Sequence, residues 1–150
     1  VQTHVALTHP DALLLRIADD YTLLIDVLLW RDSSADVSAI IAATALRSVR
    51  LDLPALIRKN RDDREVIGRI YSSACYIDGA WPGILYLLYK YQDQPESALL
   101  ANTHLGGDNV HRGAVLGILL GLIQGQTVDH WYKALLLNQQ IDQEIAQLLS

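Results

Sequence analysis

Apolar residues recur at the spacing of an α-helix along almost the whole chain. Leu14, Ile17, Tyr21, Leu24 and Leu28 follow the i, i+3, i+4, i+7 pattern of a helix that buries one face. No stretch alternates apolar and polar residues with the period of two that a half-buried strand requires. The pattern therefore predicts an all-α fold, a compact orthogonal bundle of many helices.

Turn-forming and capping residues divide this pattern into separate helices. Pro10 and Asp11 favour a helix start just before the first apolar stripe, and residues 30–34 form a break. The segments that follow predict helices over residues 36–48, 55–59, 64–77, 81–91, 94–102, 109–124, 128–135 and 139–149. The acidic pairs Asp19–Asp20 and Asp62–Asp63 are interpreted as solvated helix faces.

The helix predicted over residues 109–124 carries a glycine at every fourth position, at Gly113, Gly117, Gly121 and Gly125. Four residues advance about 400° around a helix, so these glycines form one stripe. Each interior glycine destabilises a helix by roughly 1 kcal/mol relative to alanine. We therefore expect this helix to be central, with another backbone packed directly against the stripe.

Composition limits the class of protein. The chain has 150 residues, 51% of them hydrophobic, and suits a single domain over residues 1–150 with a substantial core. A net charge of −5 argues against a nucleic-acid partner. The single cysteine, Cys75, is interpreted as a buried, inert thiol and suits a reducing, cytoplasmic compartment. The most apolar run, residues 114–123, is half the roughly 20 residues that cross a bilayer, so we expect no membrane partner.

The stretch LGGDNVHRG at residues 105–113 has the parts of a ligand-binding turn. Glycines let a ligand reach the backbone, and a helix N-terminus presents unpaired N–H groups. Asp108 is interpreted either as the N-cap of the next helix or as a metal ligand or ribose contact. His104 and His111 flank the turn, and a His/Asp/His metal site is an alternative to capping or surface roles for both. The polar cluster at residues 8–11 is interpreted as a helix cap.

Three stretches, in this order, resemble one family. THPD at residues 8–11, AWPGILYLLYKY at 80–91 and ALLANTHLGGDNVHRGAVLGILLGLIQG at 98–125 are similar to the C-terminal half of the ADP-ribosylglycohydrolases. That family includes the J-type lens crystallins. The resemblance implies an all-α fold around two magnesium ions, and hydrolysis of the glycosidic bond in ADP-ribosylated proteins or small molecules.

The family's second metal-binding turn has the pattern Gly-Gly-Asp-x-Asp-Thr. The resemblance implies that Asp108 binds Mg²⁺, and that the substrate contacts are made by Gly106, Gly107, Asn109 and His111. Val110 stands where the second aspartate belongs, and His111 stands where the threonine belongs. Valine supplies no ligand and imidazole is a poor substitute for oxygen on Mg²⁺, so we expect weakened magnesium binding.

The family's Thr-Asp-Asp cluster belongs to an N-terminal half, and no such stretch occurs in this sequence. We expect either a part of a longer or split protein or a degenerate relative. We also expect an exposed apolar surface that accepts a second copy or the N-terminal half. The isolated chain is expected to be inactive. The alternatives are a non-catalytic structural or interaction protein of this fold, and a module that binds ADP-ribose or a nucleotide.

Overall fold

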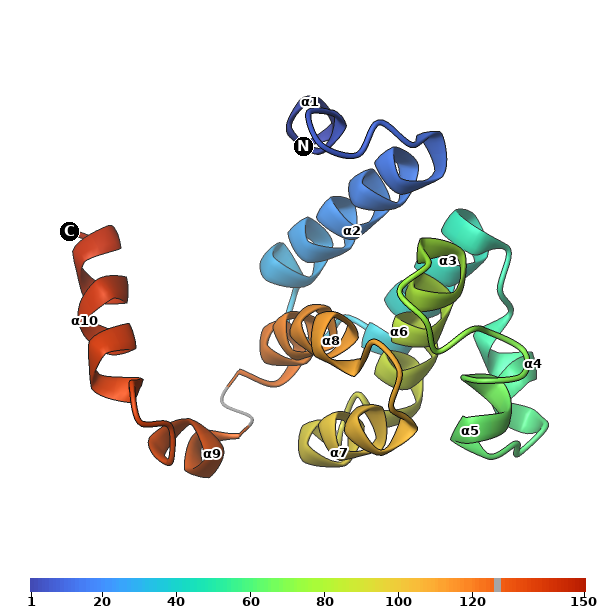
Figure 1. Ribbon diagram of the computed structural model, residues 1–150. Coiled ribbons are helices and arrows are strands. Elements are labelled where there is room, and N and C mark those ends of the chain that lie inside the picture. The colour runs from blue at the N-terminus through green and yellow to red at the C-terminus, as the bar shows by residue number, and fades with distance from the viewer. Residues whose placement is uncertain (126–127) are drawn as a thin grey trace.

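The computed structural model describes residues 1–125 and 128–150, and these residues form ten helices and no strand (Figure 1). In chain order the helices are α1 Gln2–Ala6, α2 Ala12–Trp30, α3 Val37–Val49, α4 Leu53–Arg58, α5 Asp63–Val66, α6 Ile77–Tyr91, α7 Pro95–Leu105, α8 Asn109–Gln124, α9 Asp129–Lys133 and α10 Asn138–Leu148. The prediction of an all-α fold is confirmed. No helix among the described residues is long and apolar enough to cross a membrane.

Helix α6 occupies the centre of the fold. Its eight consecutive residues from Trp81 to Leu88 are buried, and α2, α3, α4, α7 and α8 all pack against it. A helix that is apolar on every side must be covered on every side. The prediction that the glycine-bearing helix is central is therefore wrong. Helix α8 lies beside α6 and buries only Arg112, Leu116, Leu119 and Leu120.

Aspartate side chains cap four of the helices, and one of them is Asp62, which was predicted as part of a solvated face. Asp11 accepts a hydrogen bond from the Leu14 amide at 2.8 Å, which starts α2. Three further caps follow the same pattern: Asp36 to the Ala39 amide (3.0 Å), Asp52 to the Ala55 amide (2.8 Å) and Asp62 to the Arg64 amide (2.9 Å). Each such cap stabilises its helix by about 1 kcal/mol.

The helix predicted over residues 64–77 is wrong. Helix α5 ends at Val66, and residues 67–76 form a non-helical connecting segment of turns and bends. Gly68 has a φ of 147°, a backbone conformation that residues other than glycine rarely adopt. Its amide donates a hydrogen bond to the Tyr71 carbonyl at 2.6 Å. Cys75 lies on this segment and is exposed, so its prediction as a buried thiol is also wrong.

Helix α6 begins at Ile77, four residues before the predicted start, so Pro82 lies inside it. Proline lacks the N–H that would bond to the carbonyl of the residue four positions earlier, which is Asp78. Asp78 is in the exposed first turn of α6, where water can satisfy that carbonyl. The proline therefore removes only one bond at the edge of the helix.

Asp63 joins α5 to α6 through a half-buried polar cluster, so its prediction as part of a solvated face is wrong. The carboxylate lies 2.5 Å from Lys90 Nζ and accepts hydrogen bonds from the hydroxyls of Tyr86 (2.7 Å) and Tyr91 (2.6 Å). Burial raises the pKa of Asp63, but these three hydrogen bonds and the Lys90 charge outweigh it and leave the pKa below its usual range.

One face of α8 is left without a neighbour in the described part of the chain. Val110 is 74% exposed, and a Cβ added at Gly117 or Gly121 would meet no atom within 4 Å. At Gly113, by contrast, an added Cβ would lie 2.9 Å from the Asn102 side chain. Close backbone packing against the whole glycine stripe is therefore not found, and only Gly113 is tightly packed.

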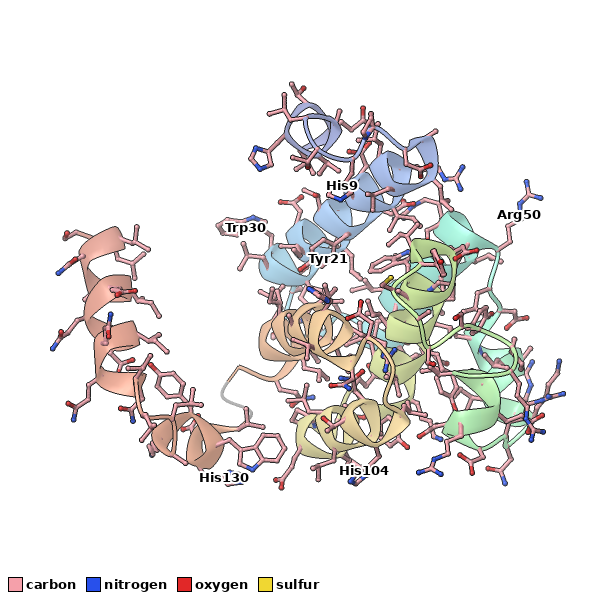
Figure 2. The ribbon with its side chains drawn as sticks, in the orientation of Figure 1. His9, Tyr21, Trp30, Arg50, His104 and His130 are labelled. Carbon is pink, nitrogen blue, oxygen red and sulfur yellow. The ribbon has the colours of Figure 1, made fainter. Side chains whose placement is uncertain are left out.

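Exposed apolar side chains continue onto α2, which packs against α8. Leu23, Val27 and Trp30 lie one turn apart on α2 and are all exposed, and Figure 2 shows Trp30 pointing away from the neighbouring helices. Helices α9 and α10 lie to one side of the other eight in Figure 1. The expectation of exposed apolar surface agrees with these positions.

We predict that Asp63→Asn lowers the free energy of unfolding at pH 7 by roughly 2 kcal/mol, the magnitude of hydrogen bonds to a charged group. The stabilisation by Asp63 is complete above its unfolded-state pKa of about 3.9 and is lost as the pH falls through the lower folded-state pKa. Urea denaturation at pH 7 and pH 3 measures both effects. The variant should therefore lose less stability than the wild type between these pH values.

The matched control is Glu65→Gln, which removes an exposed ion pair with Arg61. This control should change stability by less than about 1 kcal/mol. If the free energy of unfolding depends on pH equally in the wild type and in Asp63→Asn, the Asp63 carboxylate does not stabilise the fold in the way predicted.

Candidate functional site

The turn between α7 and α8 is shaped by two glycines. Gly106 and Gly107 have φ values of 66° and 62°, in the left-handed region that glycine enters without strain. A Cβ on Gly107 would lie 2.1 Å from the Ser73 carbonyl oxygen, whereas one on Gly106 would meet nothing within 4 Å. The connecting segment therefore lies directly against the turn at Gly107, and Gly106 faces open space.

The buried guanidinium of Arg112 supports the turn through hydrogen bonds. Arg112 is only 2% exposed and donates to the Asn102 side-chain oxygen at 2.6 Å and to the Gly106 carbonyl at 2.9 Å. Its other terminal nitrogen lies 3.4 Å from the Ser73 carbonyl, which also accepts a bond from the Asp108 amide at 2.9 Å. One side chain thus ties together α7, α8, the turn and the connecting segment.

Arg112 is a site residue that the sequence predictions missed. Burial lowers the pKa of its guanidinium from the usual value, and the nearby Asp108 charge partly opposes that shift. The signal in the sequence was its position: Arg112 shares a helix face with Leu116, Leu119 and Leu120, all buried. An arginine on the apolar face of a helix must find internal acceptors, and here carbonyl oxygens supply most of them.

Asp108 occupies the N-cap position of α8 but does not cap it. Its side chain accepts no bond from an amide of the first turn, unlike the four capping aspartates of α2 to α5. Instead its Oδ1 lies 2.6 Å from Nδ1 of His111, while a quarter of the side chain stays exposed. The capping interpretation of Asp108 is therefore wrong: the carboxylate pairs with His111 and remains partly exposed.

The structure brings together most of the residues predicted around Asp108. The Asn109 side chain turns back to the Gly107 carbonyl at 3.4 Å, and the His111 ring is mostly exposed above the carboxylate. His104, however, lines a different pocket with residues 62–64. Figure 2 shows His104 on α7, well away from His9 near the start of α2. The residue 8–11 cluster is a cap, as predicted, through Asp11.

The donor set at the turn does not fit a pair of magnesium ions. Within residues 1–125 and 128–150, no three His, Cys, Asp or Glu side chains are grouped so that they could hold a metal ion. Asp108 is the only carboxylate of the turn, its Oδ1 already pairs with His111, and the exposed side chain of Val110 offers no oxygen. Magnesium needs several oxygen ligands in near-octahedral geometry, and the buried Arg112 charge adds repulsion.

Comparison with known proteins matches the chain to one described family. The family model described as ADP-ribosylglycohydrolase matches residues 1–150. Searches of curated proteins and of solved structures return no match. The matched range contains the turn, Arg112 and all of the described helices.

We predict that Gly107→Ala destabilises the protein far more than Gly106→Ala. Both substitutions force alanine to a positive φ, which destabilises by about 1–3 kcal/mol. Only Gly107→Ala also drives a methyl group into the Ser73 carbonyl, and it should therefore lose roughly 3 kcal/mol or more in chemical denaturation. Equal losses for the two variants would show that the connecting segment does not press on the turn.

Proposed function

Since the family model matches the whole chain, this chain belongs to the ADP-ribosylglycohydrolase family, and we propose that its Gly106–Asp108 turn forms part of a surface that binds ADP-ribose. Asp108 would accept a hydrogen bond from a ribose hydroxyl. Gly106, which has open space where a side chain would be, would let the ligand reach the backbone. Asn109 and His111 would supply further polar contacts at the same turn.

The observation that carries this proposal is the orientation of the Asp108 side chain. Aspartates cap α2, α3, α4 and α5, yet the aspartate before α8 leaves the amides of that helix without a side-chain acceptor. The fold thereby forgoes roughly 1 kcal/mol of helix stabilisation. It keeps instead a partly exposed carboxylate beside amide groups and a histidine, and these are groups that a sugar hydroxyl and a phosphate can contact.

We further propose that this chain alone does not hydrolyse the glycosidic bond. The resemblance implies a hydrolase that uses magnesium, and Asp108 would be one metal ligand of such an enzyme. Val110 is exposed at the position where a second carboxylate would be needed. Binding without turnover is therefore the activity that the described residues support best.

A non-catalytic role as an interaction protein is the second candidate. The observation that favours it is the uncovered apolar surface of α2 and α8, where Trp30 is 78% exposed. Apolar patches of this kind mark surfaces that bind other proteins. The two candidates are separable, because the turn and this surface can be altered independently.

We predict that ADP-ribose raises the melting temperature of the chain, and that Asp108→Ala removes most of that rise. A ligand that binds only the folded state adds about 2.7 kcal/mol at one hundred times its Kd. Thermal denaturation with increasing ADP-ribose measures the effect. The matched control is Asp52→Ala, which removes a true cap, lowers stability by about 1 kcal/mol and leaves the response to ADP-ribose unchanged.

No response of the wild type to millimolar ADP-ribose would contradict binding at the turn. An equal response in the wild type and in Asp108→Ala would place any binding elsewhere on the protein.

We predict that the chain releases no ADP-ribose from an ADP-ribosylated protein, with or without added magnesium. The double variant Val110→Asp, His111→Thr restores the family pattern of the turn. It still lacks the family's Thr-Asp-Asp cluster of metal ligands, so it should also be inactive. Chromatographic detection of free ADP-ribose with substrate in excess is the measurement. Turnover by the unaltered chain would refute the proposal that it acts by binding alone.

A further inference from the structure

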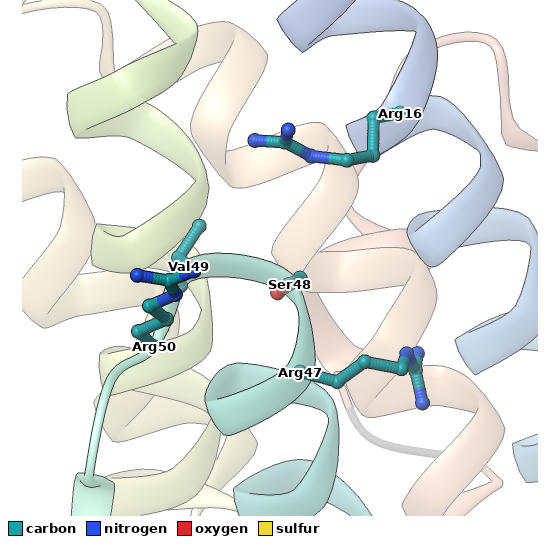
Figure 3. A pocket seen from close by; sticks show the side chains of 5 residues that line it. All are labelled: Arg16, Arg47, Ser48, Val49 and Arg50. Atoms are coloured by element: carbon teal, nitrogen blue, oxygen red, sulfur yellow. The ribbon is translucent and has the colours of Figure 1, made fainter.

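A pocket of about 340 Å³ lies between the start of α2 and the end of α3, and it shares no residue with the Gly106–Asp108 turn. Its lining contains three arginines, a serine and a valine: Arg16, Arg47, Ser48, Val49 and Arg50. Figure 3 shows Arg16 reaching from α2 over the end of α3, where Ser48, Val49 and Arg50 lie, while Arg47 points to the opposite side. The backbone places Arg50 here because it takes a left-handed conformation (φ 54°) that ends α3.

Two of the three guanidinium groups carry unbalanced charge. Arg47 pairs with Asp20 of α2 at 3.1 Å, and its charge is thereby offset. The side chains of Arg16 and Arg50 make no ion pair and no hydrogen bond within the described residues. The pocket therefore presents a net charge of two positive units, from two groups with free N–H donors.

Ser48 adds a buried hydroxyl to this lining. The residue is 7% exposed, and its Oγ accepts a hydrogen bond from Trp81 Nε1 at 3.1 Å. Because that bond uses the oxygen as acceptor, the hydroxyl can still donate its own hydrogen to a bound ligand.

We propose that this pocket binds a phosphoryl dianion, as free phosphate or as the terminal phosphate of a small organic ester. Two guanidinium groups can each donate a pair of N–H bonds to phosphate oxygens, and the Ser48 hydroxyl can donate a further one. The charges of Arg16 and Arg50 balance those of the dianion. The volume lies at the lower end of the range of about 300–1,000 Å³ for ligand pockets, which leaves room for a small group attached to the phosphate.

The end of α3 does not oppose this binding strongly. Helix C-termini present carbonyl oxygens, which repel anions by roughly 0.3–1 kcal/mol. Here the Arg50 amide donates to the Leu46 carbonyl and the Leu51 amide donates to the Ala45 carbonyl, and these bonds take up part of that negative potential. Each charge-assisted hydrogen bond contributes more than this repulsion removes.

Titration of the full chain with inorganic phosphate, followed by amide chemical shifts in NMR, tests the proposal. We expect saturable shifts centred on residues 48–51, and Arg16→Ala or Arg50→Ala should each weaken binding about tenfold. Arg58→Ala removes an exposed arginine of α4 and serves as the control with unchanged binding. A parallel titration with ribose 5-phosphate distinguishes the sources, because tighter binding than that of inorganic phosphate would identify an organic ester.

Shifts that do not saturate, that sodium chloride reproduces at equal ionic strength, or that persist in both arginine variants would overturn the proposal. It does not depend on ADP-ribose binding at the turn. If the Arg16→Ala variant loses phosphate binding but its melting temperature still rises with ADP-ribose, the two ligands bind at separate sites.

Discussion

The buried guanidinium of Arg112 is the interaction on which the arrangement of the turn depends. A charged group with 2% exposure is tolerated only when internal acceptors replace its water. The Asn102 side chain and the carbonyls of Gly106 and Ser73 supply them, and these acceptors come from α7, the turn and the connecting segment. The same side chain therefore fixes the path of residues 67–76 and the position of Asp108. Removing it would take away the Arg112 donor of the Gly106 carbonyl and of the Asn102 side-chain oxygen at once.

Helix α8 shows what the sequence alone can predict and why. Its bounds, Asn109–Gln124, were predicted without error, because glycines stand on both sides of a long apolar run and punctuate it. The connecting segment was predicted as helix because its composition is compatible with one. Its actual path depends on the φ of Gly68 and on bonds to Ser73 from residues more than thirty positions away. Contacts at that distance leave no local pattern.

In the candidate site, too, local sequence predicted the features that depend on neighbouring residues and not those that depend on distant contacts. The residues of the turn were identified correctly as neighbours, since the turn itself brings them together. The sequence left the role of Asp108 open between a helix cap and a ligand contact, because five aspartates precede helices in this chain and local sequence does not distinguish the one that leaves its helix uncapped. His104 was grouped with the turn on sequence distance alone, and α7 carries it to the pocket beside Asp63.

The uncapped start of α8 has a consequence for the strength of any ligand contact at Asp108. The carboxylate has two internal competitors for its oxygen atoms: the imidazole of His111, which it contacts in this structure, and the first-turn amides, which a change of rotamer would reach. A ligand that needs the oxygen held by a competitor binds only the fraction of molecules in which that oxygen is released, and its apparent Kd rises in inverse proportion to that fraction. Affinity at the turn is therefore governed by the rotamer populations of one side chain as much as by the ligand itself.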